Sequence, residues 1–265
     1  MTSYVLREIW IYPIKSLGGI RVKSAKVFEK GLEFDRRWML IDDDNRFMTQ
    51  RFSPKMALFK LQISDSKFQI TFKSESIDLP LERQENNKSV KAVIWDDEVE
   101  VNEVSDELSQ WISNRLEINC RLVSFPEKNQ RPVDEKYQVN HENVSLADAY
   151  PFLIIGEQSL ADLNSRLEKP VPMNRFRPNF VFSGGESFDE DKWKKISIGA
   201  TIFAVAKPCA RCVLTTVDQD TAEKGHEPLA TLSKFRKVEN KVLFGQNLIA
   251  LNHEHVYEGD EIIVE

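Results

Sequence analysis

The sequence predicts a mostly β fold with a few helices (α+β), arranged as two β-rich halves. Three observations lead to this prediction. Short apolar runs separated by turn residues follow one another up to residue 104 at a spacing of roughly 8–12 residues, which is typical of a barrel or sandwich. Apolar residues at helical spacing are confined to a few short segments. Strand-like runs then resume and continue to the C-terminus.

The first half of the chain is expected to consist mainly of strands. Alternating or β-branched apolar residues predict them, and the DDDN cluster at 42–45 predicts the turn of a hairpin. A helix is expected from Ser105 onward, because Leu108, Ile112 and Leu116 then share one face. The strands are expected over residues 4–12, 20–28, 37–41, 47–50, 56–63, 68–72, 76–81, 90–95, 98–104 and 120–125.

The second half combines strands with further helices. The polar stretch 126–144 contains two prolines and is the best candidate for a linker or a long loop. Leucines at helical spacing predict a helix over 157–167, and a short helix is expected over 229–235. We therefore predict two domains, residues 1–125 and 126–265. Strands of the second half are expected over residues 152–155, 179–182, 196–198, 201–206, 213–217, 247–251 and 261–264.

The composition limits the partners and the location of the protein. Its 265 residues include 36 basic and 42 acidic ones, and the net charge of −6 argues against nucleic acid but not against a small anion in a local basic pocket. No apolar run approaches the roughly 18 residues of a membrane span, and the alternating N-terminus does not resemble a signal peptide. Three cysteines, an odd number, indicate free thiols in a reducing compartment, and we expect a cytoplasmic protein.

The segment KPCARCVLTTVD carries the densest chemistry. Cys209 and Cys212 flank Arg211, and several interpretations are open. A zinc site would need four ligands, but Cys120 is the only other thiol. A thioredoxin-like pair needs a helix after the second cysteine, whereas the β-branched run at 213–217 predicts a strand. A disulfide would close a strained small loop, and the remaining interpretation is a pair of buried structural thiols.

The neighbours of Cys212 favour a functional thiol. Arg211 beside it favours the thiolate, which is both a nucleophile and a soft metal ligand. The β-branched run that follows is expected to hold Cys212 at the end of a rigid strand.

Two polar segments of the first half could bind an anion. In IYPIKSLGG, Lys15 and Ser16 precede a glycine pair and could cradle a phosphate, or form only a solvated turn. In GLEFDRRW, which is followed by TQR at 49–51, arginines such as Arg36 could point at one anion, or pair with nearby aspartates.

Two segments of the second half add further polar residues. In NRFRPNF, Arg177 and Asn179 enter a predicted strand with one residue between them, so both side chains can face the same side. Asp148 in SLADAYP precedes another predicted strand and could be no more than a cap or turn residue.

Taken together, these segments resemble a known family. KPCARCVLTTVDQDT, EPLATLSKFR, LFGQN and EGDEI resemble the molybdenum-cofactor sulfurase C-terminal (MOSC) domain. IYPIKSLGG, GLEFDRRWML and FMTQR resemble the β-barrel domain that precedes it, and PFLIIGEQSLADLNSRL and NRFRPNFV fit the same family. The resemblance covers nearly the whole chain and extends to amidoxime-reducing components and their bacterial relatives. It implies a MOSC N-terminal β-barrel-like domain over 1–125 and a β-barrel MOSC domain over 126–265.

The resemblance also implies a cofactor and its ligands. The cofactor would be the molybdenum cofactor, a pterin dithiolene, with Cys212 as the metal ligand and catalytic residue. The implied reaction is the reduction of small N-hydroxylated compounds, in which the oxygen atom leaves as water while molybdenum cycles between Mo(IV) and Mo(VI). The cofactor-binding residues implied by the matching motifs are Lys15, Ser16, Arg36, Asp148, Arg177, Asn179, Cys209 and Arg211.

Electrons are expected from a separate redox protein, of the ferredoxin or cytochrome type with its reductase. Some bacterial relatives carry a four-cysteine iron–sulfur domain, and three cysteines cannot supply one. No nucleic acid partner and no membrane span are expected. Two alternatives use the same pocket: a sulfur carrier or transferase with a persulfide on Cys212, and a non-catalytic module that binds or stores the cofactor.

Overall fold

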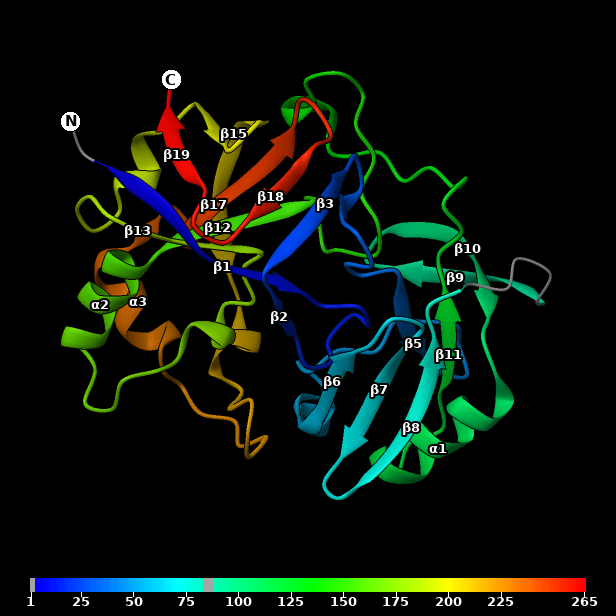
Figure 1. Ribbon diagram of the computed structural model, residues 1–265. Helices are drawn as coiled ribbons and strands as arrows, with labels where there is room; N and C mark the ends of the chain where they lie inside the picture. Colours follow the sequence, from blue (N-terminus) through cyan, green and yellow to red (C-terminus); the bar gives the residue numbers. More distant parts are fainter. Residues whose placement is uncertain (1–2, 83–87) are drawn as a thin grey trace.

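The computed structural model describes residues 3–82 and 88–265, and in this part of the chain seven strands close into a barrel (Figure 1). Pairing of β17 (Lys241–Ala250) with β12 (Phe152–Gly156), through Phe152↔Leu248 and Ile154↔Gln246, closes the ring. Neighbouring strands are antiparallel except for the parallel pair β12 and β13. In ring order the strands are β12 (Phe152–Gly156), β13 (Phe180–Ser183), β1 (Tyr4–Ile11), β19 (Glu261–Val264), β14 (Lys195–Ile198), β15 (Thr201–Arg211) and β17 (Lys241–Ala250).

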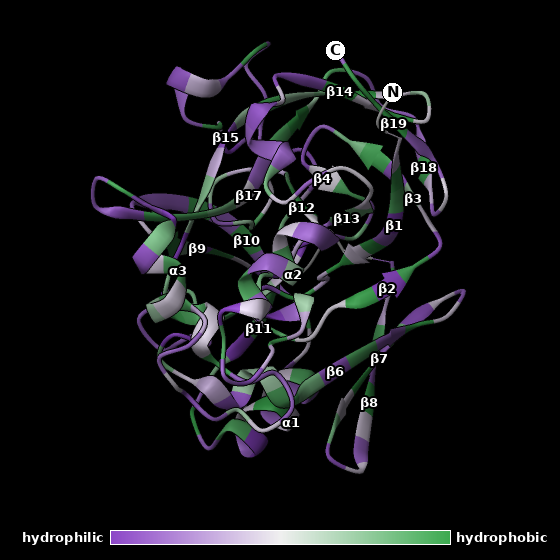
Figure 2. Cartoon of the chain, turned by 90° about the vertical axis from the view of Figure 1, so that its left-hand side faces the viewer, coloured by the Kyte–Doolittle hydropathy of each residue, from purple (hydrophilic) through white to green (hydrophobic). Residues whose placement is uncertain are grey.

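Aromatic side chains fill the barrel. Phe152, Phe180 and Phe203 are buried, with ring centroids 5.3 to 5.8 Å apart. Because side chains alternate along a strand, Leu153 and Ile155 face outward, where they join a second apolar cluster with residues of α2 (Glu157–Ser165) and α3 (Leu229–Phe235). Figure 2 shows α2 over the barrel with both hydrophobic and hydrophilic residues along it. Cover on both faces explains why all of β12 is buried.

Smaller sheets lie beside the barrel (Figure 1). Helix α1 (Asp106–Leu116) packs on two of them, and the side chain of Ser105, the residue before it, accepts the N–H of Leu108 as a helix cap. No helix of the described residues is long and apolar enough to cross a membrane. One sheet has the order β5 (Trp38–Ile41), β11 (Arg121–Ser124), β10 (Asp97–Glu103) and β9 (Ser89–Ile94); a second is β6 (Phe59–Ile63), β7 (Lys67–Phe72) and β8 (Glu75–Pro80); a third is β18 (His255–Tyr257), β3 (Ser24–Phe28) and β4 (Gly31–Leu32). The short strands β2 (Ile20–Val22) and β16 (Lys237–Val238) extend the barrel sheet beside β1 and β17.

The first strand of the chain, β1, is part of the barrel that the second half of the sequence forms. β1 pairs with β13 and β19, both of which come from the second half of the sequence. The stretch 126–144 is a long loop with buried anchors: Arg131 donates to Ser145 O and Ala147 O, at 2.9 and 2.5 Å. The division of the chain between residues 125 and 126 stays a prediction.

The expected helices and most expected strands are confirmed, but the segment after Cys212 is not a strand. Residues Val213–Thr216 form a 3-10 turn, and β15 ends at Arg211. The hydroxyl of Thr215 donates to Cys212 O at 2.9 Å, and such local side-chain bonds compete with strand pairing. The expected strand over 47–50 is also wrong, since only a single bridge joins Ile41 to Phe47.

Candidate functional site

The predicted site residues all line one pocket of about 280 Å³, where β15 meets loops of the first half of the chain. Lys15, Ser16 and Arg36 come from those loops, and Cys209 to Cys212 from the end of β15. The remaining lining residues predicted from the sequence are Asp148, Arg177 and Asn179. A larger cavity of about 640 Å³ lies elsewhere, between β8 and α1, and contains none of these residues.

The loop after β1 holds Lys15 and Ser16 in place through its backbone. The N–H of Lys15 donates to Trp38 O at 2.7 Å, and the N–H of Gly18 donates to Phe59 O at 2.9 Å. A Cβ at position 18 would lie 2.6 Å from that carbonyl oxygen, so the close approach requires glycine.

Several pocket residues have an unusual backbone conformation. The φ angles of Ser16, Arg36 and Arg177 are 67°, 51° and 54°, in the left-handed region. This conformation is unfavourable for residues with a side chain and persists where the surroundings enforce it, often at ligand sites. The backbone therefore supports a functional role for these loops.

The pocket is strongly basic although the chain is acidic overall. Six of its lining residues are basic and one, Asp148, is acidic. The basic residues are Lys15, Arg36, Arg51, Arg177, Lys207 and Arg211. Such a lining favours an anionic ligand, because charge-assisted hydrogen bonds offset the loss of water around it.

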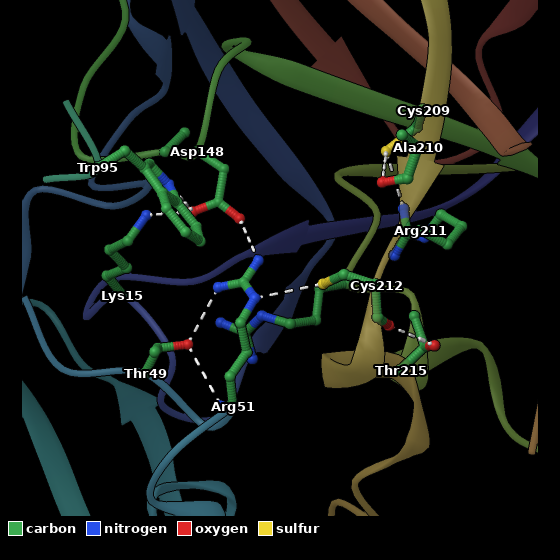
Figure 3. Close-up of polar contacts among 12 residues, drawn as sticks. Lys15, Thr49, Arg51, Trp95, Asp148, Cys209, Ala210, Arg211, Cys212 and Thr215 are labelled. Atoms are coloured by element: carbon green, nitrogen blue, oxygen red, sulfur yellow. Dashed lines mark hydrogen bonds and ion pairs between the residues drawn. The ribbon is translucent and has the colours of Figure 1, made fainter. Parts of the chain in front are cut away.

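A chain of contacts joins Lys15 to Cys212 across the pocket (Figure 3). Lys15 Nζ lies 2.5 Å from one oxygen of Asp148, and Arg51 lies 2.9 Å from the other. The Nε–H of Arg51 donates to Cys212 Sγ at 3.3 Å, and its guanidinium stacks on Trp95 at 4.7 Å. The arginine beside the sulfur of Cys212 in space is therefore Arg51.

Arg211, the sequence neighbour of Cys212, bonds elsewhere. Its guanidinium donates to Cys209 Sγ at 3.0 Å and to Phe176 O at 2.6 Å. The expectation that Arg211 is the cation beside the sulfur of Cys212 is therefore wrong, because Arg51 makes that contact. Strand alternation explains the pairing, since residues 209 and 211 lie on the same side of β15.

Arg36 and Arg177 both lie over the ring of the buried Tyr12, at 4.5 and 4.2 Å. Arg36 also contacts Asp35 at 2.5 Å and Asn179 Oδ1 at 3.3 Å. The side-chain amide of Asn179 also donates to Trp10 O and accepts the N–H of Leu153. Asn179 therefore joins strands β1 and β12 and orients Arg36 at the same time.

Burial and charge set the protonation of the contact chain. Burial lowers the pKa of Lys15 to about 8, although Asp148 acts in the opposite direction. For the half-exposed Asp148, desolvation would raise the pKa, but Lys15 and Arg51 outweigh it and hold the pKa well below its usual range. Burial also lowers the pKa of Arg177 to about 10. At neutral pH the carboxylate and its two cations are charged.

Sequence reasoning noted Arg51 in the TQR segment but did not assign it to the site, and Trp95 was missed. Both lie far from the cysteine motif in sequence, so no local pattern indicated them. The same segment contacts the motif through Gln50, whose side-chain amide exchanges two hydrogen bonds with Gln219 at 3.1 and 2.9 Å.

Comparison with known protein families finds two domain matches along the chain. Residues 3–119 match the MOSC N-terminal beta barrel domain, and residues 141–263 match the MOSC domain. The chain belongs to the family of MOSC-domain proteins that carry both.

Three relatives show the range of this family. Mitochondrial amidoxime-reducing component 1 of Homo sapiens is 34% identical, over 96% of this chain and 81% of its own length. The Mus musculus protein of the same name is 34% identical, over 90% of this chain and 74% of its own length. Molybdenum cofactor sulfurase of Oryza sativa subsp. japonica is 31% identical over 96% of this chain, which spans 33% of that protein.

Proposed function

We propose that the chain binds the molybdenum cofactor in this pocket and reduces small N-hydroxylated compounds with electrons from a separate protein. The position of Cys212 carries the proposal: its sulfur meets the Arg51 guanidinium in a pocket lined by six basic residues. Membership of the family and the names of the two mammalian relatives support it.

The donor set fits a metal that brings most of its own ligands. No cluster of three or more His, Cys, Asp or Glu suitable for a metal occurs in residues 3–82 and 88–265. Cys212 would add one thiolate to the soft dithiolene sulfurs of the pterin. When bound, the cofactor supplies the two-electron chemistry that removes the N-hydroxyl oxygen as water.

The remaining residues would hold the organic part of the cofactor. Lys15, Ser16 and Arg36 are proposed to bind its phosphate and pterin through charge-assisted and hydroxyl hydrogen bonds. Arg177, Asp148, Asn179, Cys209 and Arg211 are proposed to line the same site, with Asp148 orienting Lys15 and Arg51.

The deciding experiment compares two cysteine variants made in a host that synthesises the cofactor. Cys212→Ser should lose molybdenum or turnover, whereas Cys209→Ser should keep most of both. Molybdenum is measured by elemental analysis, and turnover by benzamidoxime reduction with a reduced viologen. Wild-type molybdenum and turnover in Cys212→Ser would overturn the proposal.

The similarity to the rice sulfurase favours one second candidate, a sulfur carrier with a persulfide on Cys212. That function predicts a labile sulfur on Cys212, released by cyanide, in protein without molybdenum. A module that only binds or stores the cofactor predicts molybdenum without turnover. The same purified samples distinguish all three.

The donor and the compartment are also proposals. We propose a ferredoxin- or cytochrome-type donor with its reductase. The three free thiols support a reducing compartment such as the cytoplasm, while the names of the mammalian relatives are mitochondrial.

A further inference from the structure

Lys207 is a basic residue of the pocket wall with no role in the proposed function. It lies on β15, two residues before Cys209, and lines the same pocket. Within the described residues, no carboxylate forms an ion pair with its ammonium group. The other cations at the pocket are engaged by a carboxylate, a carbonyl or a sulfur, so Lys207 differs from them.

Two neighbouring tyrosine rings contact the ammonium group. Lys207 Nζ lies 4.2 Å from the ring centre of Tyr137 and 4.8 Å from that of Tyr150, and the rings meet edge to face at 6.2 Å. Cation–π contacts orient an ammonium group without neutralising its charge. Lys207 therefore remains able to attract an anion.

Tyr150 contributes an unused hydrogen-bond donor. The residue is 7% exposed and lines the pocket, and its hydroxyl has no hydrogen-bond partner among the described residues. Burial, and then the charge of Asp134, raise the pKa of this hydroxyl above its usual range, so it stays protonated. A buried hydroxyl without a partner is unfavourable and favours a ligand that accepts its proton.

The place of Lys207 on the strand separates it from Cys212. At about 3.3 Å per residue, their α-carbons lie up to about 16 Å apart along the chain. The other cations have different neighbours: Lys15 and Arg51 pair with Asp148, and Arg36 and Arg177 lie over Tyr12. An anionic group held by Lys207 would thus be remote from the reacting centre.

We propose that Lys207, Tyr137 and Tyr150 form a subsite that binds a carboxylate of the substrate, remote from its N-hydroxyl group. The inference rests on the proposed function, because it names the class of N-hydroxylated compound that the same pocket prefers. Lys207 supplies the charge, Tyr150 a hydroxyl donor, and the neighbouring ring of Tyr137 a second contact that holds the ammonium group.

The test uses amidoximes that carry a carboxylate on linkers of increasing length, each matched with its uncharged methyl ester. In the wild-type holoprotein the best carboxylate should exceed its ester in kcat/KM by about tenfold, as expected for one charge-assisted contact. Lys207→Met should reduce this ratio to near one, and Lys207→Arg should keep it. Tyr150→Phe should lower it in part. Lys241→Met removes a charge at the exposed start of β17 and should leave the ratio unchanged.

A binding measurement separates this subsite from the proposed function. The corresponding amidines do not react, and calorimetry with the holoprotein should show the same preference for the carboxylate, lost in Lys207→Met. If the preference holds but uncharged benzamidoxime is not reduced, the proposed function fails and the subsite stands. If benzamidoxime is reduced but wild type shows no preference, or Lys207→Met retains it, the subsite is overturned. Loss of molybdenum in Lys207→Met also overturns it, because Lys207 would then hold the cofactor.

Discussion

Arg51 Nε donates to Cys212 Sγ across 3.3 Å, although the two residues are 161 positions apart in the chain. Contacts with Asp148 and Thr49, at 2.9 and 3.1 Å, hold the guanidinium in this position, and the ring of Trp95 covers it. A fixed cation beside a sulfur stabilises its thiolate form, which is the form that binds metals and reacts with electrophiles.

Replacing Arg51 should therefore make Cys212 less reactive. In Arg51→Gln we expect iodoacetamide to alkylate Cys212 severalfold more slowly in cofactor-free protein, because the sulfur loses the cation that it contacts. Peptide mass spectrometry resolves Cys212 from Cys209. Cys209 should react at its wild-type rate, since Arg211 rather than Arg51 contacts it.

The control for this measurement is Arg7→Gln. Arg7 is an exposed arginine of β1 that donates to Ser183 of the neighbouring strand β13. In Arg7→Gln, iodoacetamide should alkylate Cys212 at the wild-type rate. An unchanged rate at Cys212 in Arg51→Gln would show that the Arg51 contact does not govern the thiol.

The ion pair between Lys15 and Asp148 should matter more for folding than an exposed pair. Lys15 is almost fully buried while Asp148 is half exposed, so solvent screens part of the interaction. Asp148→Asn leaves the ammonium without its counter-charge and should lower the free energy of unfolding by about 1–3 kcal/mol. Urea denaturation at neutral pH measures this difference in the free energy of unfolding.

Asp220→Asn provides the comparison. Asp220 pairs with Lys60 at 2.8 Å, but both side chains are well exposed, and such pairs contribute about 0–1 kcal/mol. If both variants lost the same free energy of unfolding, burial of Lys15 would not strengthen its ion pair with Asp148.

The sequence predicted which residues line this pocket better than it predicted their contacts. Lys15, Arg36 and the cysteine motif were recognisable because local segments carry them. Arg51 was not recognisable as a site residue, because its contact with Cys212 depends on how distant loops meet. Arg211 was predicted as the partner of Cys212 only because the two residues are adjacent in the sequence. Closure of the barrel by β1 was equally hidden, since its partners β13 and β19 come from the second half of the chain. The run after Cys212 misled because hydroxyl–backbone bonds outweighed β propensity there.

Anion binding should weaken as pH rises through the pKa of Lys15. Burial lowers that pKa to about 8, and only the protonated ammonium attracts an anion. Sulfate keeps its charge over this range, so its affinity for cofactor-free protein should be constant below pH 8. Above pH 8 it should fall by up to about tenfold per pH unit, because the uncharged amine predominates.

Calorimetric titrations between pH 6 and pH 9.5 test this dependence. Lys15→Arg keeps the positive charge and should give a flat profile up to about pH 9, where the lowered pKa of Arg177, about 10, begins to contribute. A flat wild-type profile, or the same decline in Lys15→Arg, would remove Lys15 from the anion site.

Electron supply is the last property that the chain's residues predict. Of its three cysteines, Cys209 and Cys212 line the pocket and Cys120 is buried, so they cannot supply four thiolates to an iron–sulfur cluster. The sequence also lacks the glycine-rich fingerprint of a dinucleotide site. The purified chain should therefore reduce benzamidoxime with a reduced viologen but not with NADH, and a ferredoxin- or cytochrome-type donor with its reductase should restore NADH-driven turnover. That donor should dock weakly, as redox partners with small interfaces do, and high salt should slow the reconstituted reaction while leaving the viologen-driven rate nearly unchanged. Coupled loss of NADH and benzamidoxime with the isolated chain would contradict this prediction.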